Sequence, residues 1–339
     1  MMHPSPTFRF LDFCAGIGAG HAAAVKLGGE CVGYSEIDPK AKRTYRMLHD
    51  LETLWEPLLD LGDLTKMDPK EVPDFDVMLG GFPCQTFSIV GRREGFKDPR
   101  GQIIFALSDI LAAKKPNYFL LENVKGLMSH NKGETLRQIL IELRSAGYKV
   151  TWKLVSSVDF GVPQMRERVY FVGIREDLVA DDFEFEFPEK VKRTKHLRSY
   201  LKSKDPKFAV SNEGYAYLEK YLNNKYNKES GVTVEDLKKL PNFTVIDTRQ
   251  SDLRVFKKIC PTLRSGRHGL LYVKDGELRK LSGLEGLALQ GFGAPYQKRI
   301  YNVTESDLLH QAGNAFTVDV VLSLLENLFE QVERPAACA

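Results

Sequence analysis

The chain has 339 residues, 43% of them hydrophobic and 27% charged, which is the composition of a soluble globular protein long enough for two domains. No apolar run approaches the roughly 18 residues that a membrane-spanning helix needs, and the five cysteines never stand at the spacing of structural zinc ligands, so we expect neither a membrane protein nor a metal site. The net charge of +3 is divided unevenly, because Lys and Arg outnumber Asp and Glu by about two to one between residues 191 and 300 while the rest of the chain is acidic.

Apolar stretches alternate with helical patterns along the first half of the chain. Residues 8–13 predict a strand, 16–20 a tight turn, 21–27 a helix and 31–34 a second strand. Further strands are predicted at 76–79, 118–121, 150–154 and 169–174, and helices at 103–113 and 134–145. Strands that alternate with helices predict an α/β fold with a doubly wound, mostly parallel, Rossmann-like sheet.

The alternation ends near Asp177, and a region without clear periodicity follows. One amphipathic helix pattern returns at 318–329. We therefore predict a first domain at 1–178, a smaller and less regular domain at 179–300, and a segment at 301–339 that returns to the first domain. The basic charge of the middle region suits either a solvated surface or a surface for a polyanion such as DNA.

Three positions beyond the predicted strand ends favour a nucleoside ligand, since ligands of such sheets bind at this edge. They are the glycine-rich turn at 12–20, Glu36, whose carboxylate can accept from both ribose hydroxyls, and Asp63, which can accept from an adenine amine. The turn alone would suit a purely structural role equally well. A dinucleotide fold places a glycine at position 21, where this chain has His21. This difference counts against NAD and favours S-adenosylmethionine, which has no phosphate.

A cysteine follows the strand predicted at 76–79. That strand runs into Gly80-Gly81-Phe82-Pro83-Cys84-Gln85, a constrained turn at the ligand-binding edge. Most cysteines in a reducing cytosol are structural. A cysteine at a strand end, between proline and glutamine and after two glycines, indicates a candidate nucleophile instead.

Three motifs resemble those of the DNA (cytosine-5) methyltransferase family, of the bacterial and phage restriction-modification type: Phe82-Pro83-Cys84-Gln85, Glu122-Asn123-Val124 and Gln164-Met165-Arg166-Glu167-Arg168. The resemblance runs in the family's order from the turn at 12–20 to Gly313-Asn314 and covers the chain except 191–260. It implies a methyl transfer from S-adenosylmethionine, leaving S-adenosylhomocysteine, to carbon 5 of a flipped-out cytosine within a short duplex sequence.

The resemblance also implies the catalytic roles. The Cys84 thiolate adds to carbon 6 of the cytosine, Glu122 contacts ring nitrogen 3 and the amine, and Arg168 with Arg166 holds the ring carbonyl and the nearby backbone. Taken singly, Glu122 could be a capping carboxylate and the arginines could form surface ion pairs. The order of all three motifs favours the catalytic interpretation.

The cofactor residues implied by the resemblance lie at the strand ends and turns. They are Asp12, Phe13, Cys14, Ala15, Gly16, Ile17, Gly18, Glu36, Ile37, Asp63, Leu64, Gly81, Pro83 and Asn314. The chain departs from the family at Asp12-Phe13-Cys14, where Asp-Leu-Phe is usual, so stacking of the displaced aromatic ring on adenine is in doubt. Ala19 replaces a common glycine, a change that a negative φ tolerates.

Two segments are implied to contact DNA. Residues 88–101 combine glycines with basic side chains, which suits a lid over the flipped base as well as a solvated loop. The middle domain is expected to be the target-recognition domain, in which Arg suits guanine and Gln suits adenine, although the same side chains suit phosphates. The candidate DNA-binding residues are Gln85, Ser88, Val90, Arg92, Arg93, Lys97, Arg100, Arg249, Gln250, Thr262, Arg264 and Arg267.

Two other functions remain open at this point: an RNA cytosine-5 methyltransferase and a catalytically silent DNA-binding homologue. A nicotinamide dehydrogenase is a distant third because of His21. For the main hypothesis we expect double-stranded DNA as partner, a cognate restriction endonuclease as genetic partner, a monomer, and a cytoplasmic, nucleoid-associated location.

Overall fold

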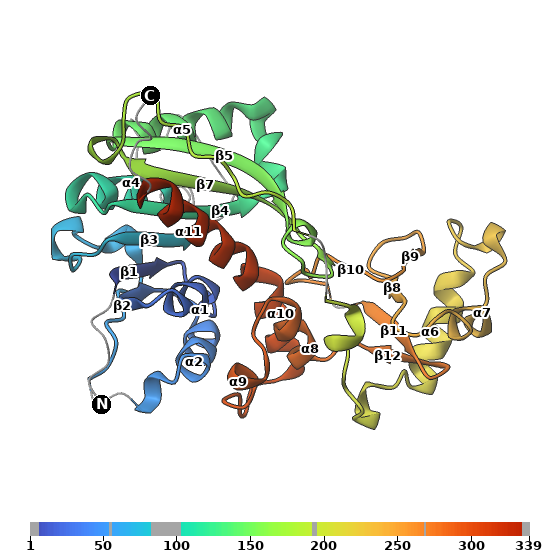
Figure 1. Ribbon diagram of the computed structural model, residues 1–339. Helices are drawn as coiled ribbons and strands as arrows, with labels where there is room; N and C mark the ends of the chain where they lie inside the picture. The colour runs from blue at the N-terminus through green and yellow to red at the C-terminus, as the bar shows by residue number, and fades with distance from the viewer. Residues whose placement is uncertain (1–6, 54–55, 83–102, 192–194, 268, 334–339) are drawn as a thin grey trace. The chain divides into compact units, whose positions relative to one another are not determined.

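The computed structural model describes residues 7–53, 56–82, 103–191, 195–267 and 269–333 (Figure 1). The chain divides into two compact units. The first unit comprises residues 1–155, 167–189 and 316–339, and the second comprises residues 156–166 and 190–315.

The first unit is built on a six-stranded sheet in the order β2-β1-β3-β4-β7-β5. Neighbours among β2, β1, β3 and β4 are parallel, and β7 runs antiparallel to β4. The strands are β1 (Phe8–Phe13), β2 (Gly29–Ser35), β3 (Val77–Gly81), β4 (Tyr118–Val124), β5 (Tyr148–Ser156) and β7 (Glu167–Arg175). The helices are α1 (Ala19–Lys26), α2 (Pro39–Leu48), α4 (Ile103–Lys114), α5 (Glu134–Ser145) and α11 (Val318–Glu333). The fold predicted from the sequence, an α/β architecture with a mostly parallel sheet, is confirmed.

Helices cover both faces of this sheet, as the apolar strands require. Side chains alternate between the faces along β1. Leu11 and Phe13 belong to a buried cluster that includes Leu107 of α4 and Ile139 of α5. The ring of Phe8 lies 5.0 Å from that of Phe329 in α11, and α11 packs on α1. The carboxyl ends of β1, β2, β3 and β4 therefore meet at one edge of a sheet that is buried on both sides.

The second unit contains a four-stranded antiparallel sheet in the order β12-β11-β8-β9, with a small core of its own. Its strands are β8 (Val245–Asp247), β9 (Arg254–Phe256), β11 (Leu270–Lys274) and β12 (Glu277–Lys280). The short strands β6 (Gln164–Met165) and β10 (Cys260–Pro261) pair in parallel. The helices are α6 (Asn212–Leu222), α7 (Val234–Lys238), α8 (Gly283–Leu289), α9 (Ala294–Gln297) and α10 (Glu305–Asn314), of which α10 packs on α8.

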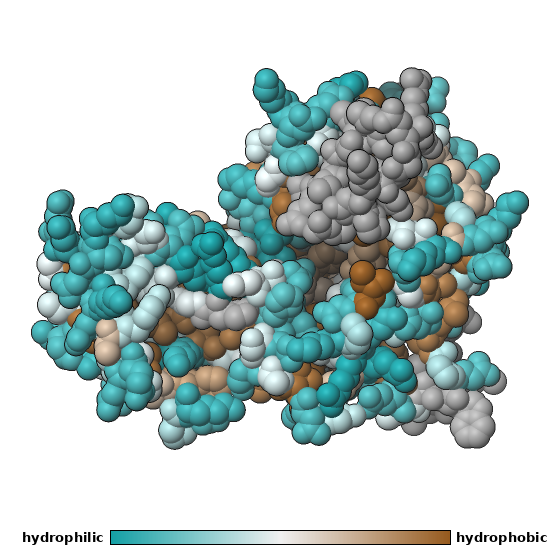
Figure 2. All heavy atoms as spheres, turned by 180° about the vertical axis from the view of Figure 1, so that it is seen from behind, coloured by the Kyte–Doolittle hydropathy of each residue, from teal (hydrophilic) through white to brown (hydrophobic). Residues whose placement is uncertain are grey.

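Hydrophilic side chains cover most of the surface seen in Figure 2, and apolar residues show mainly in the recesses between them. One stretch of the described chain, 305–333, is long and apolar enough to cross a membrane by composition alone. It consists of the two helices α10 and α11 and is mostly buried, as the core helices of a globular protein are.

Candidate active site

The turn after β1 alternates left-handed residues, with φ of 50° at Cys14, 57° at Gly16 and 81° at Gly18. The two glycines meet different surroundings. A Cβ at Gly16 would have no heavy atom within 4 Å, whereas a Cβ at Gly18 would overlap Nε2 of His49. Gly16 therefore borders open space that a ligand can enter, and Gly18 makes room for a neighbouring side chain.

His49 in turn supports the turn from behind. Its Nε2 lies 3.2 Å from the carbonyl oxygen of Ile17, and its ring stacks on His21 at a centroid distance of 3.9 Å. His21 Nδ1 lies 2.7 Å from the hydroxyl of Tyr45. Burial lowers the pKa of His21 well below its usual range, and nearby His49 lowers it further. The residue that counted against a dinucleotide thus belongs to a packed support for the turn.

Glu36 joins the end of β2 to this turn. Its Oε2 accepts from the backbone N–H of Gly16 at 2.7 Å, and its Oε1 accepts from those of Ile37 at 2.7 Å and Asp38 at 2.9 Å. The side chain of Ile37 is 69% exposed, which is unusual for a large aliphatic residue. A carboxylate, an apolar side chain and the open space at Gly16 therefore adjoin at the sheet edge.

Three carboxylates surround Cys14. Burial raises the pKa of its thiol, and the negative charges of Glu36, Asp12 and Asp63 raise that pKa further. The pKa of Asp12 is itself raised by burial, although the backbone N–H of His21 donates to its Oδ2 at 3.2 Å. Carboxylates beside Cys14 favour a positively charged ligand group, such as the sulfonium of S-adenosylmethionine.

Asp63 caps a short 3-10 turn, Leu64–Lys66. Its Oδ1 accepts from the Thr65 hydroxyl at 2.7 Å, and this hydrogen bond lowers the pKa of Asp63. Next to it, Gly62 has φ of 61° and no heavy atom within 4 Å of a Cβ position. The turn thus offers a second open space at the sheet edge. Glu36, Ile37 and Asp63, together with the open spaces at Gly16 and Gly62, fit a nucleoside-type cofactor.

The remaining cofactor candidates have varied positions. The side chains of Phe13, Ile17 and Leu64 are buried in the first unit, with the Phe13 ring 6.2 Å from that of Phe75, so these three side chains form the frame of the pocket. Ala15 is partly exposed, and Asn314 lies in the second unit, where its amide nitrogen is 3.3 Å from Nε2 of His310. A Cβ at Gly81 would lie 2.6 Å from the ring of Phe316, so a larger residue there would have to displace that ring.

The end of β3 is held by a residue of β4. The buried Asn123 donates from Nδ2 to the carbonyl oxygen of Phe82 at 2.9 Å, and its Oδ1 accepts from the backbone N–H of Val124 at 2.8 Å. Phe82 is the last described residue before Pro83 and Cys84. Asn123 therefore fixes the backbone that leads to the expected nucleophile. Outside the described residues lie Pro83, Cys84, Gln85, Ser88, Val90, Arg92, Arg93, Lys97 and Arg100.

Glu122 and Arg168 form an ion pair at the same edge. Arg168 Nε lies 2.9 Å from Glu122 Oε1, and the side chains are only 13% (Arg168) and 9% (Glu122) exposed. The antiparallel register puts Glu122 opposite Tyr170 and Val124 opposite Arg168, so the two charged residues are diagonal neighbours on one face. The structure thus brings together two residues that the sequence places 46 positions apart.

Arg166 belongs to the second unit. It is buried, and its Nη1 donates to the carbonyl oxygen of Gly313 at 3.0 Å. A Cβ at Gly313 would overlap the backbone nitrogen of Ser265, which explains the glycine of the Gly-Asn motif. In this structure Arg166 therefore joins β6 to the end of α10.

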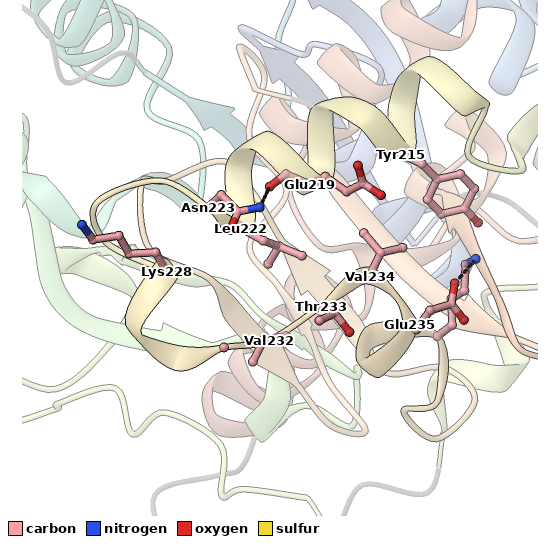
Figure 3. A pocket seen from close by; sticks show the side chains of 11 residues that line it. Tyr215, Glu219, Leu222, Asn223, Lys228, Val232, Thr233, Val234 and Glu235 are labelled. Atoms are coloured by element: carbon pink, nitrogen blue, oxygen red, sulfur yellow. Dashed lines mark hydrogen bonds and ion pairs between the residues drawn. The ribbon is translucent and has the colours of Figure 1, made fainter.

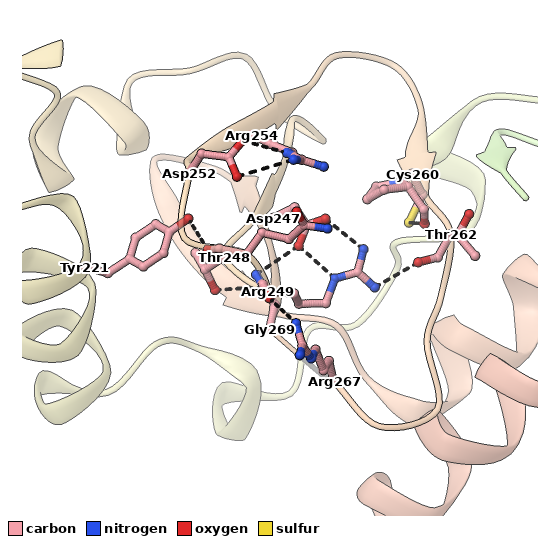
Figure 4. A network of polar contacts seen from close by, with 12 residues as sticks. Tyr221, Asp247, Thr248, Arg249, Asp252, Arg254, Cys260, Thr262, Arg267 and Gly269 are labelled. Carbon is pink, nitrogen blue, oxygen red and sulfur yellow. Dashed lines mark hydrogen bonds and ion pairs between the residues drawn. The ribbon is translucent and has the colours of Figure 1, made fainter. Parts of the chain in front are cut away.

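The structure argues against Arg249 as a base reader. Its guanidinium donates from Nε and Nη2 to the two carboxylate oxygens of Asp247 at 2.7 and 2.8 Å, and from Nη1 to the carbonyl of Thr262 at 2.8 Å (Figure 4). The Arg249 side chain is 2% exposed. Burial acts to raise the pKa of Asp247, but the hydrogen bonds from Arg249 lower it below its usual value. All three guanidinium nitrogens of Arg249 therefore donate to groups of the protein itself.

The other candidates in the second unit differ in exposure. Thr262 donates its hydroxyl to the carbonyl of Met165, which holds β10 against β6. Arg264 is exposed, Arg267 is exposed while donating to the carbonyl of Arg249 at 3.2 Å, and Gln250 is partly exposed. No group of three or more His, Cys, Asp or Glu side chains that could hold a metal ion occurs in the described part of the chain.

Sequence reasoning gave no role to Asn123, His49 or Asp247. Asn123 stands inside a motif that was recognised, so its position between Glu122 and Val124 was an available signal. Asp247 and Arg249 stand two residues apart at a strand end, a spacing that allows side chains to share a face. His49 carries no signal in the sequence alone, because its contact with Gly18 joins two separate elements.

Comparison with known proteins gives consistent matches over most of the chain. Residues 8–330 match the family model described as C-5 cytosine-specific DNA methylase. The Type II methyltransferase M.DsaV of Dactylococcopsis salina is 33% identical over 330 residues, which cover 96% of this chain and 87% of that protein. M.NlaX of Neisseria lactamica, also a Type II methyltransferase, is 35% identical over 332 residues, 95% of this chain and 96% of its own.

Two further matches extend the range of sources. The orphan methyltransferase M.Rho11sI of Bacillus phage rho11s is 44% identical over 176 residues, 51% of this chain and 34% of that protein. The crystal structure of the S. pombe Dnmt2 methyltransferase matches with a TM-score of 0.69 and 22% identity, covering 96% of this chain and 99% of that chain, which shows a shared fold.

Proposed function

The chain belongs to the C-5 cytosine-specific DNA methylase family, and from that premise we propose that it methylates carbon 5 of a flipped-out cytosine in a short, specific duplex sequence through a covalent Cys84 adduct. The observation that carries the mechanism is the buried Glu122–Arg168 pair beside Phe82, whose carbonyl is fixed by Asn123. An acidic group and a cation thus lie beside Phe82, which precedes Cys84 by two residues in the sequence.

The chemistry requires these groups because carbon 5 of cytosine is a poor nucleophile. Addition of the Cys84 thiolate to carbon 6 makes the ring an enamine, and negative charge develops toward ring nitrogen 3. Glu122 passes a proton to nitrogen 3 as that charge develops and accepts a hydrogen bond from the amine, and the low exposure of the pair strengthens these contacts relative to water. Arg168 holds the Glu122 carboxylate in position and contacts the ring carbonyl.

S-adenosylmethionine supplies the methyl group on a positively charged sulfur. Glu36 would accept from its ribose, Ile37 would pack on its adenine and Asp63 would accept from the adenine amine, while the open backbone at Gly16 would admit it. The carboxylates around Cys14 favour its charge. After methylation a base removes the carbon 5 proton, and Cys84 leaves as a thiolate.

The experiment that tests this function is single-base mapping of 5-methylcytosine in plasmid DNA from a methylation-free host that expresses the protein. We expect one short motif to be methylated, and no mark from Cys84→Ser. Folded wild-type protein that binds S-adenosylmethionine but leaves no mark on DNA would refute the proposal. Methylation of host RNA by the same protein would then indicate an RNA enzyme, and no methylation of either would indicate a silent DNA-binding homologue.

The setting follows from the same proposal. The basic second unit binds double-stranded DNA, and a monomer suffices because one cytosine is modified in each encounter. The bacterial and phage sources of the relatives support a cytoplasmic, nucleoid-associated enzyme with a cognate restriction endonuclease as its genetic partner.

A further inference from the structure

The loop between β8 and β9, residues 248–253, is held firmly by its neighbours. The Tyr221 hydroxyl donates to the carbonyl of Gln250 at 2.9 Å. The side-chain amides of Asn224 and Asn227 donate to the carbonyl of Ser251 at 2.9 and 3.0 Å. The backbone of the loop tip is therefore fixed from the side of α6 and the turn that follows it.

The base of the loop is fixed as well. The backbone N–H of Thr248 donates to the carbonyl of Gly269 at 3.1 Å, and the backbone N–H of Leu253 donates to Oδ1 of Asn227 at 2.8 Å. The side-chain amide of Gln250, in contrast, makes no hydrogen bond with another described residue. A rigid loop thus carries a partly exposed amide whose donors and acceptor are unused.

Gln250 lines an open hollow of about 490 Å³ between this loop and the end of α6. Tyr217 and Tyr226 also line it and are 66% and 59% exposed. Lys225 Nζ lies 4.9 Å from the centre of the Tyr226 ring, and Arg267 completes the wall. None of the described residues that line this hollow carries a carboxylate.

A second hollow in the same unit differs from the Gln250 hollow in the charge of its lining residues. It lies between α6 and α7, has a volume of about 480 Å³, and is lined by Glu219 and Glu235 as well as by lysines (Figure 3). Lys238 pairs with Glu235 at 2.7 Å. Acidic groups in that hollow oppose a polyanion, whereas the Gln250 hollow offers hydroxyls, amides and positive charge alone.

We propose that the Gln250 hollow receives the major-groove edge of an A·T base pair in the target sequence, with Gln250 as the residue that reads adenine. The glutamine amide offers one donor and one acceptor, which match N7 and the N6 amine of adenine. Lys225, Tyr226 and Arg267 contact the flanking phosphates. This inference rests on the proposed function and assigns one specificity-determining residue to it.

The hydrogen bonds that fix the backbone of the loop at 248–253 also favour selective binding. A side chain presented by a mobile loop loses ordering entropy when it binds, whereas the Gln250 backbone is already fixed in the free protein. The buried Arg249 next to it supplies the framework for the loop and is excluded as the reader by its bonds to Asp247.

The test uses the full-length protein and short duplexes that carry the sequence it binds best in a selection from random duplexes, with each A·T pair replaced in turn by G·C. Binding is measured by fluorescence anisotropy and methyl transfer by labelled S-adenosylmethionine. We expect Gln250→Ala to lose about tenfold of the preference for A·T at one position and to keep the other preferences. S-adenosylmethionine affinity and thermal unfolding should match those of Asn212→Ala, which removes an exposed amide outside the hollow.

The companion variant Lys225→Ala tests the phosphate contacts. It should weaken binding to all duplexes equally. The slope of log affinity against log salt concentration should fall by about one, the value for the loss of one phosphate contact. Unchanged discrimination at every position in Gln250→Ala, or a target without an A·T pair, would overturn the proposal. If wild-type protein binds the duplexes but transfers no methyl group, the proposed activity fails, while the anisotropy series still decides the role of Gln250.

Discussion

Glu122 and Arg168 form an ion pair that water barely reaches, so each charge depends on the other. We expect Glu122→Gln to lower single-turnover methyl transfer by about 10²–10⁴-fold, because an amide cannot pass a proton to nitrogen 3. It should also lower the free energy of unfolding by about 3 kcal/mol, since Arg168 remains as a buried charge without its carboxylate.

The exposed pair Lys125–Glu167 provides the matched control for Glu122→Gln. Its side chains are 57% and 44% exposed, so Lys125→Ala should change the free energy of unfolding by less than about 1 kcal/mol. Rapid-quench kinetics measure the rate of methyl transfer, and urea titration measures the free energy of unfolding. Similar losses of stability in both variants would contradict the buried-pair argument.

Asn123 acts through Phe82 and is a positioning residue. Asn123→Ala leaves the Phe82 carbonyl without its hydrogen bond, which should cost about 1–3 kcal/mol of unfolding free energy and lower kcat. Because the hydrogen bonds of the Asn123 side chain go to Phe82 and Val124 and not to the Gly16 turn, kcat should fall by a larger factor than the affinity for S-adenosylmethionine. Calorimetric titration and steady-state kinetics separate the two quantities, and an equal change in both would show a general loss of structure.

Gly16 and Gly18 give a matched pair of substitutions. Gly16→Ala should cost about 1 kcal/mol of unfolding free energy from its positive φ, and its methyl group should weaken cofactor binding by entering the open space. Gly18→Ala should cost about 3 kcal/mol, because its methyl group also overlaps His49. Chemical denaturation and calorimetry check both. Adding His49→Ala should restore part of the stability of Gly18→Ala, and no restoration would refute the overlap.

At the scale of the element, the Asp247–Arg249 pair links β8 to the loop that carries Gln250. The pKa of Asp247 is below its ordinary value of 3.8 in the folded chain, so the folded state binds fewer protons than the unfolded chain at acid pH. The stabilisation is therefore present above that ordinary value and is lost as pH falls through the lowered pKa.

This linkage predicts that β8 and β11 lose protection first in acid. Hydrogen exchange of their amides should accelerate below about pH 4 in the wild type, relative to the strands of the first unit. Asp247→Asn should exchange faster at neutral pH and show a smaller acid response, because no carboxylate remains to titrate there. An equal acid response in both proteins would rule out Asp247 as its source.

Long elements could be predicted from the sequence, and short ones could not. The pattern at 8–13 coincides with β1, and that at 134–145 with α5, because their apolar residues repeat over several turns or alternations. β8 has three residues, too few for an alternation to be recognised. Helix α2 was missed although Asp38 caps it and Pro39 follows, because charged residues dominate its exposed face.

The candidate site shows the same limit at the level of single residues. Glu122 and Arg168 could be predicted because a motif specifies them. Arg249 was a candidate by residue type alone, which gives no information on burial; the pairing of its guanidinium with Asp247 depends on the folding of β8 and the loop after it. The direction of β7 against β4 likewise follows from pairing between distant segments.

At the scale of the whole molecule, the chain passes between the two units several times. Residues 156–166 and 190–315 form the second unit, so the segment at 301–315, expected to return to the first, packs with the second through α10 and α8. The return begins at Phe316, whose ring lies against Gly81 at the end of β3. The basic charge between residues 191 and 300 lies within the second unit, and the acidic remainder belongs mostly to the first.

Helix α11 packs on α1 in the first unit but is separated from β7 in the sequence by most of the second unit. On the ribosome it emerges only after residues 190–315 have been made, and domains generally fold as they emerge. The second unit can therefore complete its core while one face of the first sheet still waits for Val321, Leu324 and Leu328. During that interval the nascent chain carries an uncovered apolar surface, which makes the timing of synthesis, and the chaperones that attend it, part of how this enzyme reaches its native state.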